Sequence, residues 1–120
     1  MKNRTLVLGA SVNTGRYSNL AIRKLITKKN EVVAIGTKAG AILDVKIEVE
    51  KIKFKNIDTV TLYLNPTNQK EYYNYIIGLK PRRVIFNPGT ENREFVKLLK
   101  EHNIETEVAC TLVLLGTNQY

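Results

Sequence analysis

The sequence has little of what several common classes of protein require. Its single cysteine, Cys110, excludes an internal disulfide framework and indicates a reducing setting. No apolar run approaches the roughly 20 residues that span a bilayer. The apolar stretch behind the basic N-terminus ends at Gly9 and Ala10, so it is too short for a signal peptide and is interpreted as a first strand. We therefore expect a cytoplasmic protein that does not act in a membrane.

Groups suited to catalysis are also scarce. The only histidine, His102, falls near the end of a predicted helix, where we expect it to stabilise the helix C-terminus. Cys110 has no histidine near it in the sequence and no metal-ligand spacing, so it is interpreted as a small buried hydrophobic residue. The loops that follow the strands supply no Ser/His/Asp set, carboxylate pair or metal cluster. We predict no catalytic residue and no metal site, and leave open whether the protein is an enzyme.

Positive charge is what the sequence has in excess. The 120 residues carry a formal net charge of +8, and it is unevenly distributed. Residues 1–60 hold 12 lysines and arginines against 5 acidic residues, whereas residues 61–120 hold 7 against 6. This asymmetry indicates an anionic partner, which could be a phosphorylated small molecule, a nucleic acid or an acidic protein. Solubility alone is the competing explanation.

Short apolar runs alternate with amphipathic segments along the chain. Strict alternation at Val45, Ile47 and Val49 predicts a strand at a sheet edge, which could pair across a homodimer. The segment 110–115 is continuously apolar and could be strand or helix. The remaining strands are predicted at 5–8, 32–35, 59–64, 84–86 and 105–108.

Three helices are predicted between these strands. The first contains Leu20 to Ile26 and is expected to be capped by Ser18 or Asn19. The second begins at a capping box formed by Asn68 and Glu71 and reaches about Leu79. The third has its apolar stripe at Phe95, Val96, Leu98 and Leu99 and ends near Asn103. In the second helix the tyrosines 72, 73 and 75 are interpreted as packing groups, because base stacking needs aromatics among many cations.

This alternation predicts a doubly wound, mostly parallel α/β sheet of Rossmann type, formed by one domain over residues 1–120. Ligands of such sheets bind beyond the carboxyl ends of the strands, where the strand order reverses. The loops of interest are therefore 9–18, 36–41, 65–68 and 87–92.

The first of these loops has features that suit a phosphate. Gly9 permits a sharp turn before a helix N-terminus, whose free N–H groups and partial positive charge favour anions. Ser11 and Ser18 add hydroxyl donors, and Arg16 adds a fixed cation. The glycine spacing is not that of a dinucleotide fingerprint, and no Gly-Lys-Ser/Thr completes a Walker A loop. An ordinary strand-to-helix turn is the competing interpretation.

The second loop distinguishes between nucleotides. An NAD-binding domain normally places an acidic residue near the end of the second strand, where it holds the ribose hydroxyls. Here Thr37 and Lys38 follow that strand instead. A lysine attracts a phosphorylated ribose, which disfavours NAD and favours NADP or coenzyme A. Lys38 could also be a solvated loop lysine.

The two later loops supply neutral polar groups. Asn65 and Asn87 occupy equivalent positions, and each is followed by a proline. Both can donate and accept hydrogen bonds, and Gly89 permits a ligand to approach the backbone. Strand termination by proline and glycine would explain the same residues without a ligand.

These loops together resemble a known family, the small stand-alone CoA-binding proteins with a Rossmann-like domain. That family is similar in turn to the N-terminal domain of the succinyl-CoA synthetase α subunit. The resemblance covers essentially the whole chain, and the stretches that carry it are 9–11, 16–18, Lys38, 64–66, 87–92 and 109–112.

The resemblance implies binding of coenzyme A or an acyl-CoA, with the pyrophosphate at the first loop and the phosphorylated adenosine toward the second strand. It assigns phosphate roles to Ser11, Arg16 and Ser18 and a charge contact to Lys38, and it places Asn65, Pro66 and Gly89 along the adenine and pantetheine. The whole predicted cofactor site is Gly9, Ala10, Ser11, Arg16, Tyr17, Ser18, Thr37, Lys38, Asn65, Pro66, Asn87 and Gly89.

The synthetase carries its phosphorylated histidine on a second domain, which this chain lacks, and His102 does not match that position. The leading interpretation is therefore a binding or regulatory module without catalysis of its own. An NADP-binding enzyme or regulatory domain and a basic nucleic-acid-binding protein are the alternatives, and a protein partner beyond a homodimer is not identified.

Overall fold

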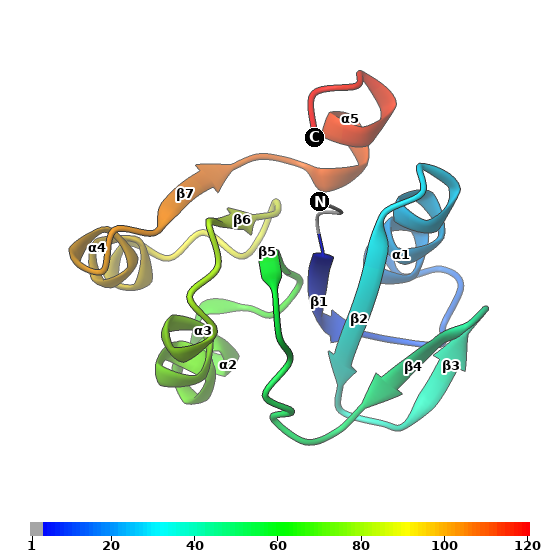
Figure 1. Cartoon of the computed structure of the whole chain (residues 1–120), viewed down its shortest axis with the longest axis horizontal. Coiled ribbons are helices and arrows are strands. Elements are labelled where there is room, and N and C mark those ends of the chain that lie inside the picture. Colours follow the sequence, from blue (N-terminus) through cyan, green and yellow to red (C-terminus); the bar gives the residue numbers. More distant parts are fainter. Residues whose placement is uncertain (1–3) are drawn as a thin grey trace.

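One sheet of seven strands, in the order β3-β4-β2-β1-β5-β6-β7, organises the computed structural model, which describes residues 4–120 (Figure 1). All neighbouring strands are parallel except β3 and β4, which form an antiparallel pair. The fold class expected from the sequence is therefore confirmed: this is a Rossmann-like α/β domain. The strands are β1 (Arg4–Ala10), β2 (Glu31–Gly36), β3 (Gly40–Ile42), β4 (Val45–Glu48), β5 (Ile57–Leu62), β6 (Arg83–Phe86) and β7 (Glu105–Val108).

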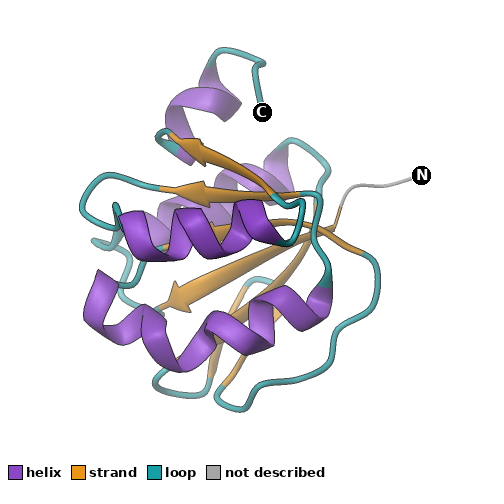
Figure 2. Ribbon diagram, turned by 90° about the vertical axis from the view of Figure 1, so that its left-hand side faces the viewer, coloured by secondary structure: helices purple, strands orange, loops and turns teal. Residues whose placement is uncertain are grey.

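Helices cover both faces of the sheet. Two of them, α1 (Tyr17–Thr27) and α5 (Thr111–Gly116), lie on one face (Figure 1). The opposite face carries α2 (Pro66–Gln69), the 3-10 helix η1 (Lys70–Tyr72), α3 (Tyr73–Leu79) and α4 (Arg93–Glu101), which lie in front of the strands in Figure 2.

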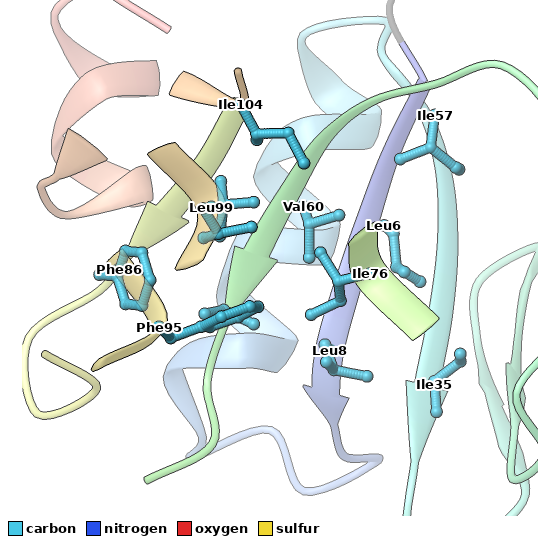
Figure 3. Close-up of a cluster of buried hydrophobic side chains, with 12 residues drawn as sticks. Leu6, Leu8, Ile35, Ile57, Val60, Ile76, Phe86, Phe95, Leu99 and Ile104 are labelled. Carbon is cyan, nitrogen blue, oxygen red and sulfur yellow. The ribbon is translucent and has the colours of Figure 1, made fainter. Parts of the chain in front are cut away.

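Alternate residues of each strand supply the two cores. Leu6, Leu8 and Val60 point toward the α2–α4 face, where Ile76 and Phe95 pack against them (Figure 3). Residues of opposite parity, such as Val7 and Ala34, meet Ile22 and Leu25 of α1 on the other face. The central strands are buried on both faces, which is why their sequences are continuously apolar.

The tyrosine-rich segment packs as expected. Tyr72, Tyr73 and Tyr75 contact the core of the α2–α4 face, and the ring of Tyr73 stacks on Phe95 with 4.3 Å between centroids. The Tyr75 hydroxyl donates a hydrogen bond to the carbonyl of Ile52, and burial raises its pKa to about 12.

The predicted edge strand lies one position inside the sheet. The prediction that residues 45–49 form the edge is wrong, because β4 has β2 on one side and β3 on the other. Its alternation has the expected cause, since Val45 and Ile47 are buried while Lys46 is exposed. Pairing of this strand across a homodimer is excluded, because both of its edges are already occupied.

Two predicted helix starts are also wrong. The N-cap residue of α1 is Arg16. Ser18 and Asn19 lie inside the first turn of α1, where both are buried. The second helical segment begins three residues earlier than its capping box implied, with Asn65 as the cap, and it is divided into α2, η1 and α3. The ambiguous segment 110–115 forms the short helix α5, which begins at Thr111.

Candidate functional site

The sheet reverses its strand order between β1 and β5. From β1 the chain crosses to α1 on one face, whereas from β5 it crosses to α2 on the other, so the two loops separate beyond the carboxyl ends of these strands. A parallel sheet opens a crevice at this point. The loop after β6 lies next to it because β6 pairs with β5.

Close backbone approach at this crevice depends on two glycines. Gly9 has a φ of +98°, and a Cβ there would lie 3.0 Å from the carbonyl carbon of Tyr63. A Cβ on Gly36 would lie 2.3 Å from the carbonyl oxygen of Ala10. Both glycines therefore allow the strand ends to pack closely against each other. For Gly9 this packing role adds to the turn that was predicted from the sequence.

The N-terminus of α1 opens into this crevice without a capping side chain. Arg16 occupies the cap position in an extended conformation, and among the residues that the structure describes no side chain caps the first turn. The preceding loop is held by its own contacts, since the Asn13 side chain accepts from the N–H of Gly15 and the Asn19 side chain donates to the carbonyl of Ser11. A rigid loop thus presents unpaired donors and the partial positive charge of an 11-residue helix.

A cleft of about 360 Å³ lies in front of this helix end. It brings together six of the residues predicted from the sequence, contributed by the loops after β1, β5 and β6. The cleft is also lined by four residues that were not predicted from the sequence as ligand contacts: Tyr63, Leu64, Pro88 and Thr90. The six predicted residues are Gly9, Arg16, Tyr17, Ser18, Asn65 and Gly89.

A smaller apolar pocket of about 250 Å³ adjoins the cleft. The two share Tyr17, Tyr63 and Pro88, so they form one continuous depression. The apolar pocket is completed by Asn87, Cys110 and Leu112. Cys110 is half-buried and lines this pocket, so its interpretation as a core residue is wrong.

The other predicted residues lie outside both hollows. Thr37 and Lys38 are exposed in the bend between β2 and β3, on the β2 side of the crevice. Ala10 and Ser11 stand at the end of β1, and Pro66 is the first residue of α2. None of these five lines the cleft, and their contacts with a ligand stay predictions.

Two asparagines that were expected to face a ligand have structural partners. Asn65 caps α2, because its side-chain oxygen accepts from the N–H of Asn68 at 2.9 Å. Asn87 is buried, donates to the Thr61 hydroxyl and the Leu62 carbonyl, and accepts from the N–H of Thr111. Asn87 therefore joins β5, β6 and α5 in the wall of the apolar pocket.

Gln69 is a residue that the sequence analysis missed. It is fully buried, and its amide donates to the carbonyls of Leu64 and Thr90, both at 2.8 Å. Asn92 donates in turn to the Gln69 side-chain oxygen. Gln69 thus fixes two walls of the cleft relative to each other. The sequence gives no signal for this role, because the two loops that Gln69 joins come together only in the folded chain.

Tyr63 carries the most unusual polar group of the site. Among residues 4–120, its hydroxyl and Arg4 Nε are the only buried side-chain polar atoms without a hydrogen-bond partner, and Arg4 Nε lies 3.3 Å from a Glu31 carboxylate oxygen. Burial raises the pKa of Tyr63 to about 12, and the nearby Thr111 and Thr61 hydroxyls lower it to a lesser extent. Those two hydroxyls bond to each other at 2.8 Å. The Tyr63 hydroxyl is therefore enclosed beside two other hydroxyls and is neutral at pH 7.

The cleft has a cation, Arg16, where the helix begins and a carboxylate at another wall, where Glu91 accepts from the N–H of Gly89 at 2.8 Å. Within the described residues Arg16 and Lys38 form no ion pair, whereas Arg82 and Arg83 at the other end of the strands are paired with carboxylates. His102 follows the last residue of α4, where its ring lies 3.0 Å from the Leu98 carbonyl, as expected of a residue at a helix end. Residues 4–120 contain no cluster of three metal-ligating side chains and no helix able to cross a membrane.

Comparison with known proteins assigns this arrangement to a family. A family model described as "CoA binding domain" matches residues 3–116. The chain belongs to the CoA-binding domain family. A search of curated proteins found no match.

Three solved structures share the fold of this family member over most of their length. One, described as an uncharacterized protein, is 46% identical, with a TM-score of 0.96 over 100% of this chain and 99% of that one. A Thermus thermophilus protein is 20% identical, with a TM-score of 0.86 and coverage of 99% and 91%. A hypothetical protein of Pyrococcus horikoshii OT3 is 23% identical, with a TM-score of 0.85 and coverage of 98% and 84%. The last two show the fold alone.

Proposed function

We propose that this protein binds coenzyme A in the cleft at the switch point of the sheet, as a binding or regulatory module without catalysis of its own. The observation that carries the proposal is the uncapped N-terminus of α1, which opens into a cleft beside Arg16 in a member of the CoA-binding family. Free N–H groups, a helix dipole and a guanidinium suit a diphosphate. The residues present therefore fit the group that the family implies.

The residues along the strand ends suggest the direction of the bound molecule. The diphosphate would lie against the N–H groups of Tyr17 and Ser18, with Arg16 beside it. Lys38, beyond β2, would attract the phosphate on the ribose. The pantetheine arm would then extend the other way, past Asn65 and Gly89. In this arrangement Ala10, Ser11, Thr37 and Pro66 flank the ligand.

The proposed setting is the cytoplasm, which agrees with a chain that has one cysteine. The proposed ligand is coenzyme A or an acyl-CoA, and homodimer formation remains a separate prediction.

Calorimetric titration with three ligands tests the proposal. We expect coenzyme A to bind, dephospho-coenzyme A to bind more weakly, and NADPH to give no heat. Arg16→Ala should weaken binding of coenzyme A by about 10- to 100-fold, because a charge-assisted hydrogen bond contributes about 1.5–3 kcal/mol. Arg93→Ala is the matched control, since Arg93 is also an exposed arginine at a helix start but lies outside the cleft.

The binding of coenzyme A and the role of Lys38 would be contradicted by different results. A flat titration with millimolar coenzyme A overturns it, and binding of NADPH in its place favours the dinucleotide alternative. Lys38→Ala should reduce the difference between coenzyme A and dephospho-coenzyme A, whereas Lys70→Ala should not. Equal affinity of the native protein for these two ligands would remove the role of Lys38.

A further inference from the structure

Gln69, the last residue of α2, connects the loops that form two walls of the cleft. Its side chain is fully buried, and its amide nitrogen donates to the carbonyls of Leu64 and Thr90, both at 2.8 Å. Leu64 follows β5 and Thr90 follows β6, and both line the cleft, whereas Gln69 does not. The pairing of β5 with β6 ends at Leu62 and Phe86. Beyond that pair, the two hydrogens of one amide group link the two loops.

Each of the two loops is held by contacts of its own. In the loop after β6, the Thr90 hydroxyl donates to the Asn87 carbonyl, and the Glu91 carboxylate accepts from the N–H of Gly89. In the loop after β5, the Asn65 side chain caps α2. Because each loop is fixed internally, the link through the amide of α2 determines how far apart the two loops stand.

The Gln69 side chain has one orientation that satisfies its neighbours. Its oxygen accepts from the side-chain amide of Asn92 at 2.9 Å, so its nitrogen must face the two carbonyls. Asn92 is fixed in turn, because its own oxygen caps α4 by accepting from the N–H of Phe95. A buried amide whose donors and acceptor are all bonded keeps its position, since each unmade bond would cost free energy. Gln69 is therefore a rigid spacer between the loops.

Resting on the proposed function, we propose that Gln69 is a positioning residue that sets the width of the cleft before coenzyme A binds. It does not line the cleft, so it acts on the ligand only through the two loops. A site whose walls are already in place loses less conformational freedom when a ligand binds, which favours affinity. Without the amide, the ligand would have to order the walls as it binds, and its affinity would fall.

Gln69→Glu turns this link into one that depends on pH. A protonated carboxyl group can donate to one of the two carbonyls, whereas an ionised one donates to neither. Burial raises the pKa of a carboxyl group, so ionisation is expected above the usual range for glutamate. Compared with the native protein at the same pH, the variant should bind coenzyme A about threefold more weakly near pH 5.5, where one bond is lost, and about tenfold more weakly near pH 9, where both are lost. Calorimetric titration measures both affinities.

Gln119→Glu is the matched control, because Gln119 is the other glutamine of the sequence, is exposed and lies outside the cleft. It adds the same charge and should match the native protein at both pH values. Referring each affinity to the native protein at that pH cancels the titration of the ligand and of Tyr73 and Glu94, which Asn92 links to Gln69. Gln69→Met removes both donors without adding a charge, and it should weaken binding by about tenfold at both pH values.

Thermal unfolding separates a positioning role from a purely structural one. If the Gln69 variants melt at a lower temperature but bind coenzyme A with native affinity at both pH values, the inference is wrong and the proposed function stands. If Gln69→Glu does not fold at the higher pH, the affinity of Gln69→Met decides in the same way. If the native protein does not bind coenzyme A, the proposed function fails first.

Discussion

At the scale of single residues, Gly9 lies where β1 passes nearest to the chain leaving β5. Its positive φ and the 3.0 Å that a Cβ would leave to the Tyr63 backbone both require glycine. Gly78 has neither constraint, because it is exposed in α3 and a Cβ there would meet nothing within 4 Å. Replacing each glycine by alanine should therefore change the stability of the protein in opposite directions.

Gly9→Ala should lower the free energy of unfolding by about 2–4 kcal/mol, because it adds backbone strain and a steric clash. Gly78→Ala should raise it by about 0.4–1 kcal/mol, because alanine restricts the unfolded chain and suits a helix. Urea denaturation measures both changes. An unchanged midpoint for Gly9→Ala would contradict the close approach of β1 and β5.

At the scale of elements, the start of α2 shows why a helix cap can be misread from sequence. Asn68 and Glu71 have capping-box spacing, but Asn65 and Pro66 lie just before them. Proline is favoured at the first helical position, so this pair is the stronger start signal, and Asn65 is the cap in the structure. Asn68 contributes only its backbone N–H to that bond.

Asn65→Ala should therefore lower the free energy of unfolding by about 1 kcal/mol, which is the usual value of an N-cap. Asn68→Ala should change it by less than about 0.5 kcal/mol, as expected for an exposed side chain. Thermal unfolding at one pH compares the two variants. A larger loss for Asn68→Ala than for Asn65→Ala would restore the start that the sequence suggested.

At the scale of the whole molecule, the alternation of apolar runs and amphipathic segments was enough to predict a doubly wound sheet. The period of each segment is local, so it can be read from sequence. The strand β3 could not be predicted from the sequence, because a strand of three residues is too short to show a hydrophobic period. Tyr63 and Gln69 were missed for another reason: their importance depends on loops that the fold brings together from β1, β5 and β6.

Ligand binding at the crevice should stabilise the whole domain, because the cleft joins loops from three strands. Coenzyme A at 100 times its dissociation constant should add about 2.7 kcal/mol to the free energy of unfolding. For a domain of this size, the melting temperature should rise by on the order of 10 °C. Differential scanning fluorimetry measures this rise in melting temperature. An unchanged melting temperature at saturating coenzyme A would show that binding does not involve the folded crevice.

The sheet also has an open border at β7, whose outer side pairs with no strand formed by residues 4–120. Glu105 and Glu107 lie on this border, where they pair with Arg82, which precedes β6, and with Arg83 of β6. A second molecule that aligned its own β7 there in antiparallel register would bring further carboxylates against these two, which disfavours sheet extension. The same acidic border that helps to position β7 is therefore expected to keep concentrated protein from assembling into fibrils.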